Sequence, residues 1–251
     1  APAAPSVPVA RAVRARVTPP PPPAFVPPVH CADPAKLNAM YAQMGRKDAD
    51  TLGNGDCLLY AVLGLTVANS AYSPVESAHL AHVVRAMAVA HASSMPLELQ
   101  RRLGLADHAR DAAGRPVYDT RGVPLTVLQA QSARRAFMTD AILPSLATCI
   151  GVDIAVVLSD QAGTQQPFLH VYRQVPDTEA AAASSQLPID VLPWDPADAE
   201  FAALFSAAPA LIHSDLSLHY RTSVSLAGGW PFHPPRLRGL LDANPLEAGE
   251  N

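Results

Sequence analysis

The chain has 251 residues, of which 49% are hydrophobic, and a formal net charge of −4. This length suits one large domain or two small ones with a sizeable core. The mildly acidic charge argues against nucleic-acid binding, which normally requires a basic surface, and no apolar run reaches the roughly 18 residues of a membrane-spanning helix. The chain starts at Ala1 without a methionine or a signal peptide, so we expect an excised or processed product.

Residues 1–35 are dominated by Pro, Ala and Val and include a run of five prolines from Pro19 to Pro23. This composition offers too little to bury and favours extended polyproline II backbone. We therefore interpret residues 1–35 as a flexible linker to a folded domain. A ligand for a proline-binding module is the alternative.

Helical signals dominate the first half of the folded region. Ser73 is placed to cap a helix that begins with Pro74, and Glu76 completes a capping box with the serine. Pro144 should break the last of these helices, and Gly151 should end it. The apolar face of the helix after Ser73 is expected to contain Leu80, Val83, Val84, Met87 and Val89. The helices expected in this half are residues 34–44 (capped by Asp33), 57–69, 74–91, 96–105 and 125–149.

Strand patterns gather towards the C-terminal end of the chain. Short runs rich in Val, Ile, Tyr and Thr are bounded there by turn residues. Helices first and strands last indicate an α+β fold, and we see no internal repeat. The expected strands are residues 153–158, 168–173, 210–213 and 218–224. Elsewhere we expect loops at 48–55, 107–122 and 175–194, a short helix at 196–205, and a tail rich in Pro and Gly at 227–251.

The three cysteines, Cys31, Cys57 and Cys149, are widely spaced and odd in number. This argues against a disulfide framework or a zinc site and leaves room for one working thiol. His79 and His82 lie three residues apart, a spacing that can suit a metal, but no third ligand is nearby in the sequence. We interpret these two histidines as solvated or packed side chains.

A glycine-rich turn leads into Cys57, and an apolar, helix-like run follows it. Gly53 and Gly55 allow the turn to be tight. A cysteine in the first turn of a helix lies near the positive end of the helix dipole, which lowers the pKa of its thiol. The backbone N–H groups of Gly55, Asp56 and Cys57 are candidates to hold an oxyanion. The alternative is an unreactive cysteine buried beside a turn.

A cysteine nucleophile needs a base, which can be distant in sequence. Of the nine histidines, three lie on expected strands, where a sheet can aim a side chain: His170, His213 and His219. His219 opens the stretch His219-Tyr220-Arg221-Thr222-Ser223-Val224, in which an aromatic residue is followed by small polar and apolar ones.

The cysteine turn and this late stretch together resemble the OTU (ovarian-tumour) family of cysteine deubiquitinases. That family has an Asp-Gly-Asn-Cys-Leu turn that opens a helix, and a late His-Tyr followed by Asp or Asn and a Ser-Val-like strand. This chain has Asn54-Gly55-Asp56-Cys57-Leu58, with Asn and Asp exchanged. The stretch 146–156 and the helix 76–91 also stand where the family has comparable segments, so the likeness covers roughly residues 36–226.

The resemblance implies a papain-like OTU fold, in which helices pack around a small, mostly antiparallel sheet and the nucleophile lies at a helix N-terminus. The catalytic domain would be residues 36–226. The cysteine and the histidine are 219 − 57 = 162 residues apart. This is longer than in compact members and implies insertions at 107–122 and 175–205. Long insertions and degenerate motifs are typical of bacterial effectors, so we expect secretion into a host and action in its cytoplasm.

The resemblance also implies the chemistry. Cys57 would attack the isopeptide bond of ubiquitin or polyubiquitin, and a thioester would form and then be hydrolysed. His219 would hold the thiolate and protonate the leaving amine, without a metal or cofactor, in a monomer. Tyr220 would line the groove for the ubiquitin tail or, alternatively, be a core aromatic residue.

The sequence does not identify a single third catalytic residue. Arg221 stands where the family often has Asp or Asn, and its side chain cannot accept a hydrogen bond from His219. Asn54 occupies the family's Asp position and is our first candidate. The alternatives are a dyad without a third member, or one of three carboxylates, Asp48, Asp50 and Asp215.

Two other functions are compatible with these residues. One is a different papain-like cysteine protease or an acyltransferase. The other is a catalytically inert ubiquitin-binding module, which Arg221 favours.

Overall fold

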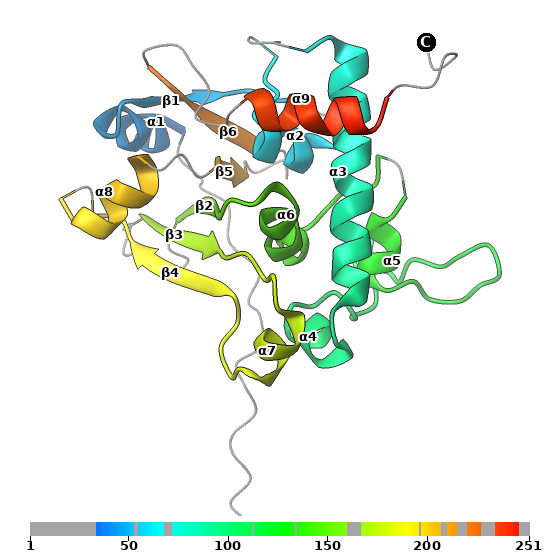
Figure 1. Cartoon of the computed structure of the whole chain (residues 1–251). Helices are drawn as coiled ribbons and strands as arrows, with labels where there is room; N and C mark the ends of the chain where they lie inside the picture. Colours follow the sequence, from blue (N-terminus) through cyan, green and yellow to red (C-terminus); the bar gives the residue numbers. More distant parts are fainter. Residues whose placement is uncertain are drawn as a thin grey trace, which may run out of the picture.

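One six-stranded sheet organises the part of the chain that the computed structural model describes (Figure 1). The strands are β1 (Arg46–Ala49), β2 (Ile154–Ser159), β3 (Pro167–Tyr172), β4 (Ile189–Pro193), β5 (Ala210–Ser214) and β6 (Tyr220–Ser225). Their order in the sheet is β1-β6-β5-β2-β3-β4, and only the β2–β5 pair among these strands is parallel. The described residues are 34–52, 55–67, 72–111, 113–133, 135–159, 167–195, 197–206, 210–214, 220–226 and 234–245.

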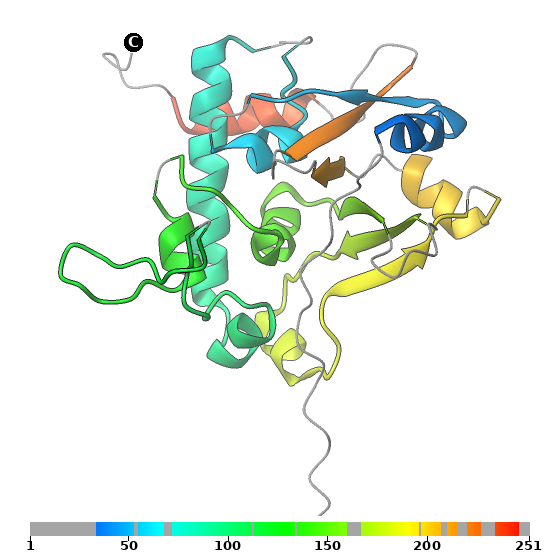
Figure 2. The same ribbon diagram turned by 180° about the vertical axis from the view of Figure 1, so that it is seen from behind.

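Helices cover both faces of this sheet, as Figures 1 and 2 show. Alternate residues of β2 explain the two layers, since Ile154 and Val156 join the main apolar cluster while Ala155 and Val157 join a second one. The second cluster contains Tyr41 of α1 and Phe201 of α8. The helices are α1 (Pro34–Gln43), α2 (Cys57–Leu63), α3 (Pro74–Ser94), α4 (Leu97–Arg102), α5 (Val127–Gln131), the 3-10 turn η1 (Asp140–Ile142), α6 (Leu143–Ile150), α7 (Thr178–Ala183), α8 (Ala199–Ser206) and α9 (Pro234–Ala243).

α2 is the central helix of the main cluster. All seven of its residues are buried, and it contacts β5, β6 and α3. Its sequence, CLLYAVL, is apolar on every side, as expected for a helix enclosed by other elements. The expected helix 57–69 therefore ends early. Gly64 adopts φ 73°, and its N–H and that of Leu65 bind the carbonyls of Ala61 and Tyr60, which closes the helix.

α3 begins as its capping signal predicts. The Ser73 hydroxyl accepts a hydrogen bond from the Glu76 N–H (3.2 Å), and the Glu76 carboxylate accepts one from the Ser73 N–H (2.8 Å). Its buried face is narrower than expected, because Val83, Met87 and Val89 are only half-buried. The face consists of Ser77, Leu80, Ala81, Val84, Arg85, Ala88 and Ala92, so that an arginine lies in the middle of an apolar stripe.

Several expected loops contain regular structure. The loop 48–55 starts with the end of β1, which pairs with β6, and the loop 175–194 contains α7 and β4. The expected tail after residue 226 contains α9, which contacts α3. The expected helix 125–149 is instead three pieces, α5, η1 and α6, although Gly151 ends the last one in a left-handed conformation (φ 70°) as predicted.

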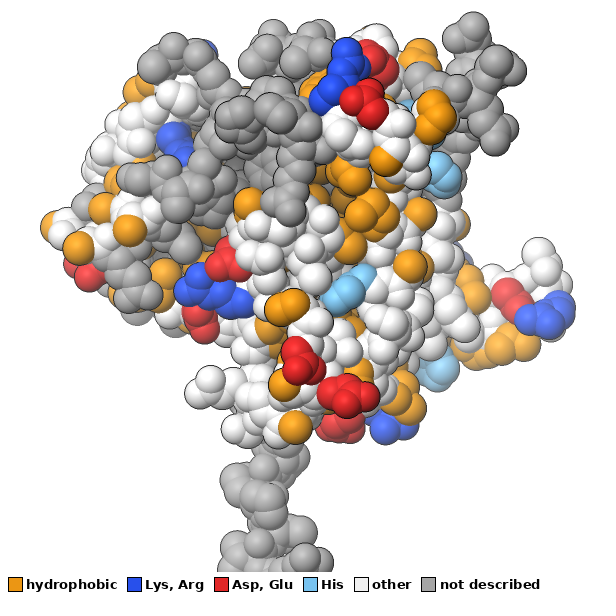
Figure 3. Space-filling model, viewed as in Figure 1, with side chains coloured by type: hydrophobic (Ala, Val, Ile, Leu, Met, Phe, Trp, Pro, Cys, Tyr) orange, Lys and Arg blue, Asp and Glu red, His pale blue; other side chains and the backbone are white. Residues whose placement is uncertain are grey.

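The segment 111–126 holds an internal repeat, contrary to our expectation. Residues 111–118 and 119–126 share Asp, Gly and Pro at the same positions. Asp111 accepts hydrogen bonds from the N–H groups two and four residues later, both at 2.9 Å, and Asp119 does the same, both at 2.8 Å. These two turns form a projection beside α5 with acidic and basic side chains together at its tip (Figures 1 and 3).

Candidate active site

Cys57 is the first residue of α2 and is only 3% exposed. Burial raises the pKa of its thiol above the ordinary value, and the negative charge of Asp56 adds to this effect. The backbone N–H groups of Tyr220, Leu58 and Cys57 itself interact with the thiol and lower its pKa, which opposes this rise. The expected lowering of the thiol pKa is therefore wrong, because desolvation outweighs the position at the helix start.

The N–H groups that face the sulfur differ from the set expected to hold an oxyanion. Of Gly55, Asp56 and Cys57, only the Cys57 N–H is among them. Gly55 has a clear conformational reason to be glycine, since its φ is +85° and an added Cβ would lie 2.0 Å from the carbonyl oxygen of Arg135. An oxyanion site formed by Gly55 and Asp56 stays a prediction.

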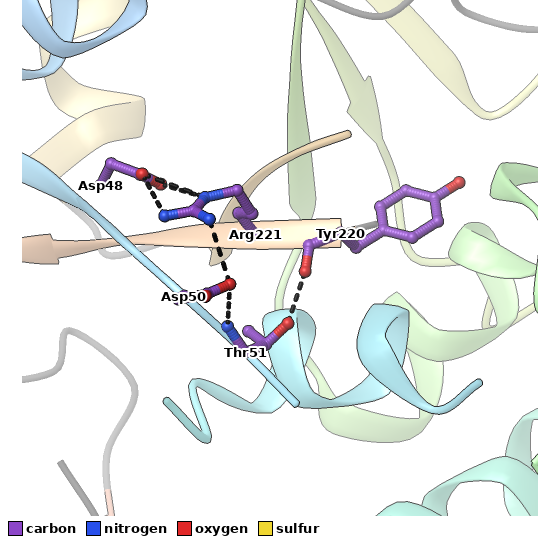
Figure 4. Close-up of polar contacts among 5 residues, drawn as sticks. All are labelled: Asp48, Asp50, Thr51, Tyr220 and Arg221. Atoms are coloured by element: carbon purple, nitrogen blue, oxygen red, sulfur yellow. Dashed lines mark hydrogen bonds and ion pairs between the residues drawn. The ribbon is translucent and has the colours of Figure 1, made fainter. Parts of the chain in front are cut away.

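β6 meets the start of α2 at Tyr220. The Tyr220 N–H interacts with the Cys57 thiol. The Tyr220 carbonyl accepts a hydrogen bond of 2.5 Å from the Thr51 hydroxyl (Figure 4). Both backbone groups of Tyr220 are thus held against the segment that carries the cysteine. His219 lies outside the described residues and precedes Tyr220 in the sequence.

The side chain of Tyr220 belongs to the core rather than to an open groove. It is 4% exposed, and its ring packs beside Phe137 with centroids 6.0 Å apart. Its hydroxyl donates to Asp140 at 2.6 Å. Burial raises the pKa of Asp140 to about 6, against the lowering effect of this hydrogen bond. Of the two roles expected for Tyr220, the structure therefore has the core aromatic.

Arg221 binds two of the candidate third catalytic residues. The Nη2 and Nε groups of its guanidinium donate hydrogen bonds to the Asp48 carboxylate, at 2.6 and 3.0 Å. The third nitrogen, Nη1, lies 3.1 Å from the Asp50 carboxylate (Figure 4). These contacts tie β6 to β1 and to the segment after it. The other two candidates, Asn54 and Asp215, lie outside the described residues.

Arg85 of α3 is a residue that the sequence analysis missed. It is 2% exposed, and its Nη2 lies 2.7 Å from Asp56, the residue before Cys57. The same nitrogen donates to the carbonyls of Gly55 (3.3 Å) and Ala136 (2.8 Å). A single arginine within an apolar stripe is a signal for a buried cation that needs partners, and the signal was available in the sequence.

Two other histidines, both on α3, have structural contacts. His79 Nε2 lies 2.6 Å from the carbonyl of Asn244, and His91 lies between the Ser145 hydroxyl and the Val175 carbonyl, both at 3.2 Å. His82 is exposed. Within the described ranges, no group of three His, Cys, Asp or Glu side chains could hold a metal ion.

A hollow of about 230 Å³ lies between β4 and α8. Three strands separate β4 from β6, so the hollow is remote from Cys57. The hollow is lined by Leu192, Pro193, Asp195, Asp198 and Phe201.

None of the helices in the described part of the chain is long and apolar enough to cross a membrane.

No protein-family model, no curated protein and no solved structure matches this chain.

Proposed function

We propose that this chain is a cysteine-dependent deubiquitinase of the OTU type, with Cys57 as nucleophile and His219 as base. One observation carries the proposal: β6 packs against α2, and the backbone N–H of its first residue, Tyr220, interacts with the Cys57 thiol and lowers its pKa. The two stretches that resemble the family are 220 − 57 = 163 residues apart at these positions, and they meet at the sulfur. The α+β arrangement around one sheet, with α2 enclosed, supports a papain-like OTU fold as part of the same proposal.

The environment of the thiol explains why a base is needed. Because burial raises the thiol pKa, little thiolate forms at neutral pH unless a neighbouring group accepts the proton. In the proposed reaction His219 takes this proton, and the sulfur attacks the carbonyl carbon of the ubiquitin C-terminal glycine. The tetrahedral oxyanion collapses to a thioester, His219 protonates the departing lysine amine, and water then hydrolyses the thioester.

The third member of the proposed site is Asn54. Arg221 binds the carboxylates of Asp48 and Asp50, which gives both residues a structural role. Asn54 immediately precedes Gly55 in the sequence, and the carbonyl of Gly55 accepts a hydrogen bond from Arg85. We propose ubiquitin or polyubiquitin as substrate, a monomeric enzyme without metal or cofactor, and action in the cytoplasm of a host cell as a bacterial effector.

The proposal is tested with ubiquitin that carries a thiol-reactive group at its C-terminus. We expect one ubiquitin-sized mass to be added to the wild-type chain and none to Cys57→Ala. His219→Ala should slow labelling by at least about a hundredfold, the lower range for loss of a general base. Circular dichroism of each variant controls for folding.

One observation favours an alternative function. The Cys57 thiol is nearly inaccessible and its pKa is raised, as in an unreactive structural cysteine. Ubiquitin affinity by calorimetry, without any labelling of a folded chain, would identify an inert binding module. If the folded chain showed no affinity for ubiquitin and no labelling, another acyl donor would be the substrate to test next.

A further inference from the structure

Arg85 is a buried cation whose hydrogen bonds converge on the turn before Cys57. Its Nη2 binds the Asp56 carboxylate and the Gly55 carbonyl, while Nη1 donates to the carbonyl of Gln131 at 2.7 Å. The guanidinium therefore connects three segments of the chain: α3, the cysteine turn and residues 131–136. A buried arginine is tolerated only where such partners compensate for its lost hydration.

The pair that Arg85 forms with Asp56 matters for the thiol because of charge. The Asp56 carboxylate raises the pKa of Cys57, and the guanidinium lies only 2.7 Å from that carboxylate. A cation this close to the carboxylate opposes its negative charge at the neighbouring thiol. Tyr220, whose hydroxyl is bound to Asp140, also interacts electrostatically with Cys57.

We propose that Arg85 is a positioning residue for Cys57, which fixes the turn through Gly55 and offsets the negative charge of Asp56 beside the thiol. This inference rests on the proposed function, in which Cys57 is the working thiol. It adds a residue from α3 that touches neither the substrate nor the sulfur.

The test measures how fast iodoacetamide alkylates Cys57 between pH 6 and 10.5. Mass spectrometry of the Cys57 peptide separates this thiol from Cys31 and Cys149, so the native cysteines stay in place. The variants are Arg85→Met, Asp56→Asn and the double variant. Arg102→Met is the matched control, because Arg102 is also buried (8% exposed) but binds the carbonyl of Ser184.

We expect the two single variants to move the pH midpoint of alkylation in opposite directions. Arg85→Met leaves the Asp56 charge without this cation and should raise the midpoint by about one pH unit, a tenfold loss of rate below it. Asp56→Asn removes a negative charge and keeps the cation, so the midpoint should fall. The double variant should return close to wild type, and Arg102→Met should not move the midpoint.

A purely structural role predicts a different pattern. Loosening the turn in either single variant would hydrate the thiol and lower both midpoints, because burial is what raises the pKa. Shifts of the same sign, or no shift, would therefore overturn the inference. If Arg85→Met does not fold, Arg85→Lys takes its place in the test. This variant keeps the charge, so its midpoint should stay within about 0.3 pH unit of the wild-type midpoint.

The ubiquitin reagent separates this inference from the proposed function. Both are supported if the alkylation midpoints of the two single variants shift in opposite directions and Arg85→Met slows labelling by the ubiquitin reagent about tenfold at pH 7.5. If the two variants shift in opposite directions but the reagent does not label the wild-type chain, the effect of Arg85 on the thiol is supported. Ubiquitin is then overturned as the substrate.

Discussion

At the scale of single residues, Asp140 links the core to the candidate site. Asp140 is 6% exposed, and its carboxyl group accepts a hydrogen bond from the Tyr220 hydroxyl at 2.6 Å. The backbone of Tyr220 in turn reaches the Cys57 sulfur. Because burial raises the pKa of Asp140 to about 6, its ionised form is disfavoured in the folded chain.

The raised pKa of Asp140 predicts a pH dependence of stability. Its stabilising contribution should be complete below about pH 4, the pKa of an unfolded aspartic acid, and should be lost as the pH rises through 6. Asp140→Asn keeps an acceptor for Tyr220 and does not titrate. Relative to this variant, we expect the wild-type free energy of unfolding to fall by about 2.4 kcal/mol between pH 4 and 7.

Urea unfolding at four pH values measures this difference. Asp195→Asn is the control for a change of carboxylate to amide, since Asp195 is exposed and takes no part in the contact between Asp140 and Tyr220. Parallel profiles for wild type and Asp140→Asn would contradict the buried, protonated carboxyl group.

At the scale of elements, the contact between β1 and β6 depends on side chains as well as on the ladder. β1 is only four residues long, and it pairs in antiparallel register with β6 at the edge of the sheet. Arg221 adds a two-donor ion pair with Asp48, and both side chains are mostly buried, at 27% and 20% exposed. Such geometry is stronger than that of an ordinary surface pair.

A double-mutant cycle of Arg221→Ala and Asp48→Ala should therefore give a coupling free energy of about 1 kcal/mol, reduced in 0.5 M salt. The equivalent cycle of Arg115 and Asp111 is the comparison, because Arg115 is 77% exposed. We expect about 0.3 kcal/mol or less there. Equal coupling in the two cycles would show that the β1–β6 ion pair contributes nothing beyond an exposed one.

Two local signals predicted the ends of elements correctly, and other elements depend on distant partners. The Ser73–Glu76 capping box and Gly151 act within one helical turn, so the sequence alone places the start of α3 and the end of α6. β1 has no alternating pattern in its four residues and is a strand because β6 pairs with it. α9 was hidden by the prolines and glycine in and around it.

In the candidate site, too, the features set by local sequence were predicted and those set by distant packing were not. The glycine turn and the cysteine at a helix start are local, and both were predicted from the sequence. The rise in the thiol pKa depends on how deeply α2 is enclosed by β5, β6 and α3, which no local pattern specifies. The binding of Asp56 by Arg85, 29 residues later, likewise needs the packing of α3.

At the scale of the whole molecule, the candidate site lies where several distant segments meet. The turn before α2, the middle of α3, residues 131–136 and the start of β6 all contribute contacts around Cys57. α3 is common to most of these contacts, and it also packs against α6 and α9 (Figure 1). The position of Arg85 therefore depends on what supports α3 from its other sides.

α9 is one such support. Leu241 is 8% exposed and belongs to the main apolar cluster, and Arg238 lies 3.0 Å from Glu76 at the start of α3. The ion pair is exposed and should contribute little, whereas the loss of a buried leucine side chain typically costs about 2–3 kcal/mol. The contribution of α9 to stability should thus come mainly from Leu241.

Two truncations of the chain test this contribution. Deleting residues 234–251 should lower the free energy of unfolding by at least as much as Leu241→Ala, about 2 kcal/mol or more. Deleting residues 1–30, which we interpret as a linker, should change neither the unfolding nor the rate of labelling by the ubiquitin reagent. Denaturant unfolding of both truncations beside Arg238→Ala separates the apolar contact from the ion pair. If loss of residues 234–251 left stability unchanged, α9 would not support α3, and the position of Arg85 would depend on the other elements that contact α3, among them α2, α5 and α6.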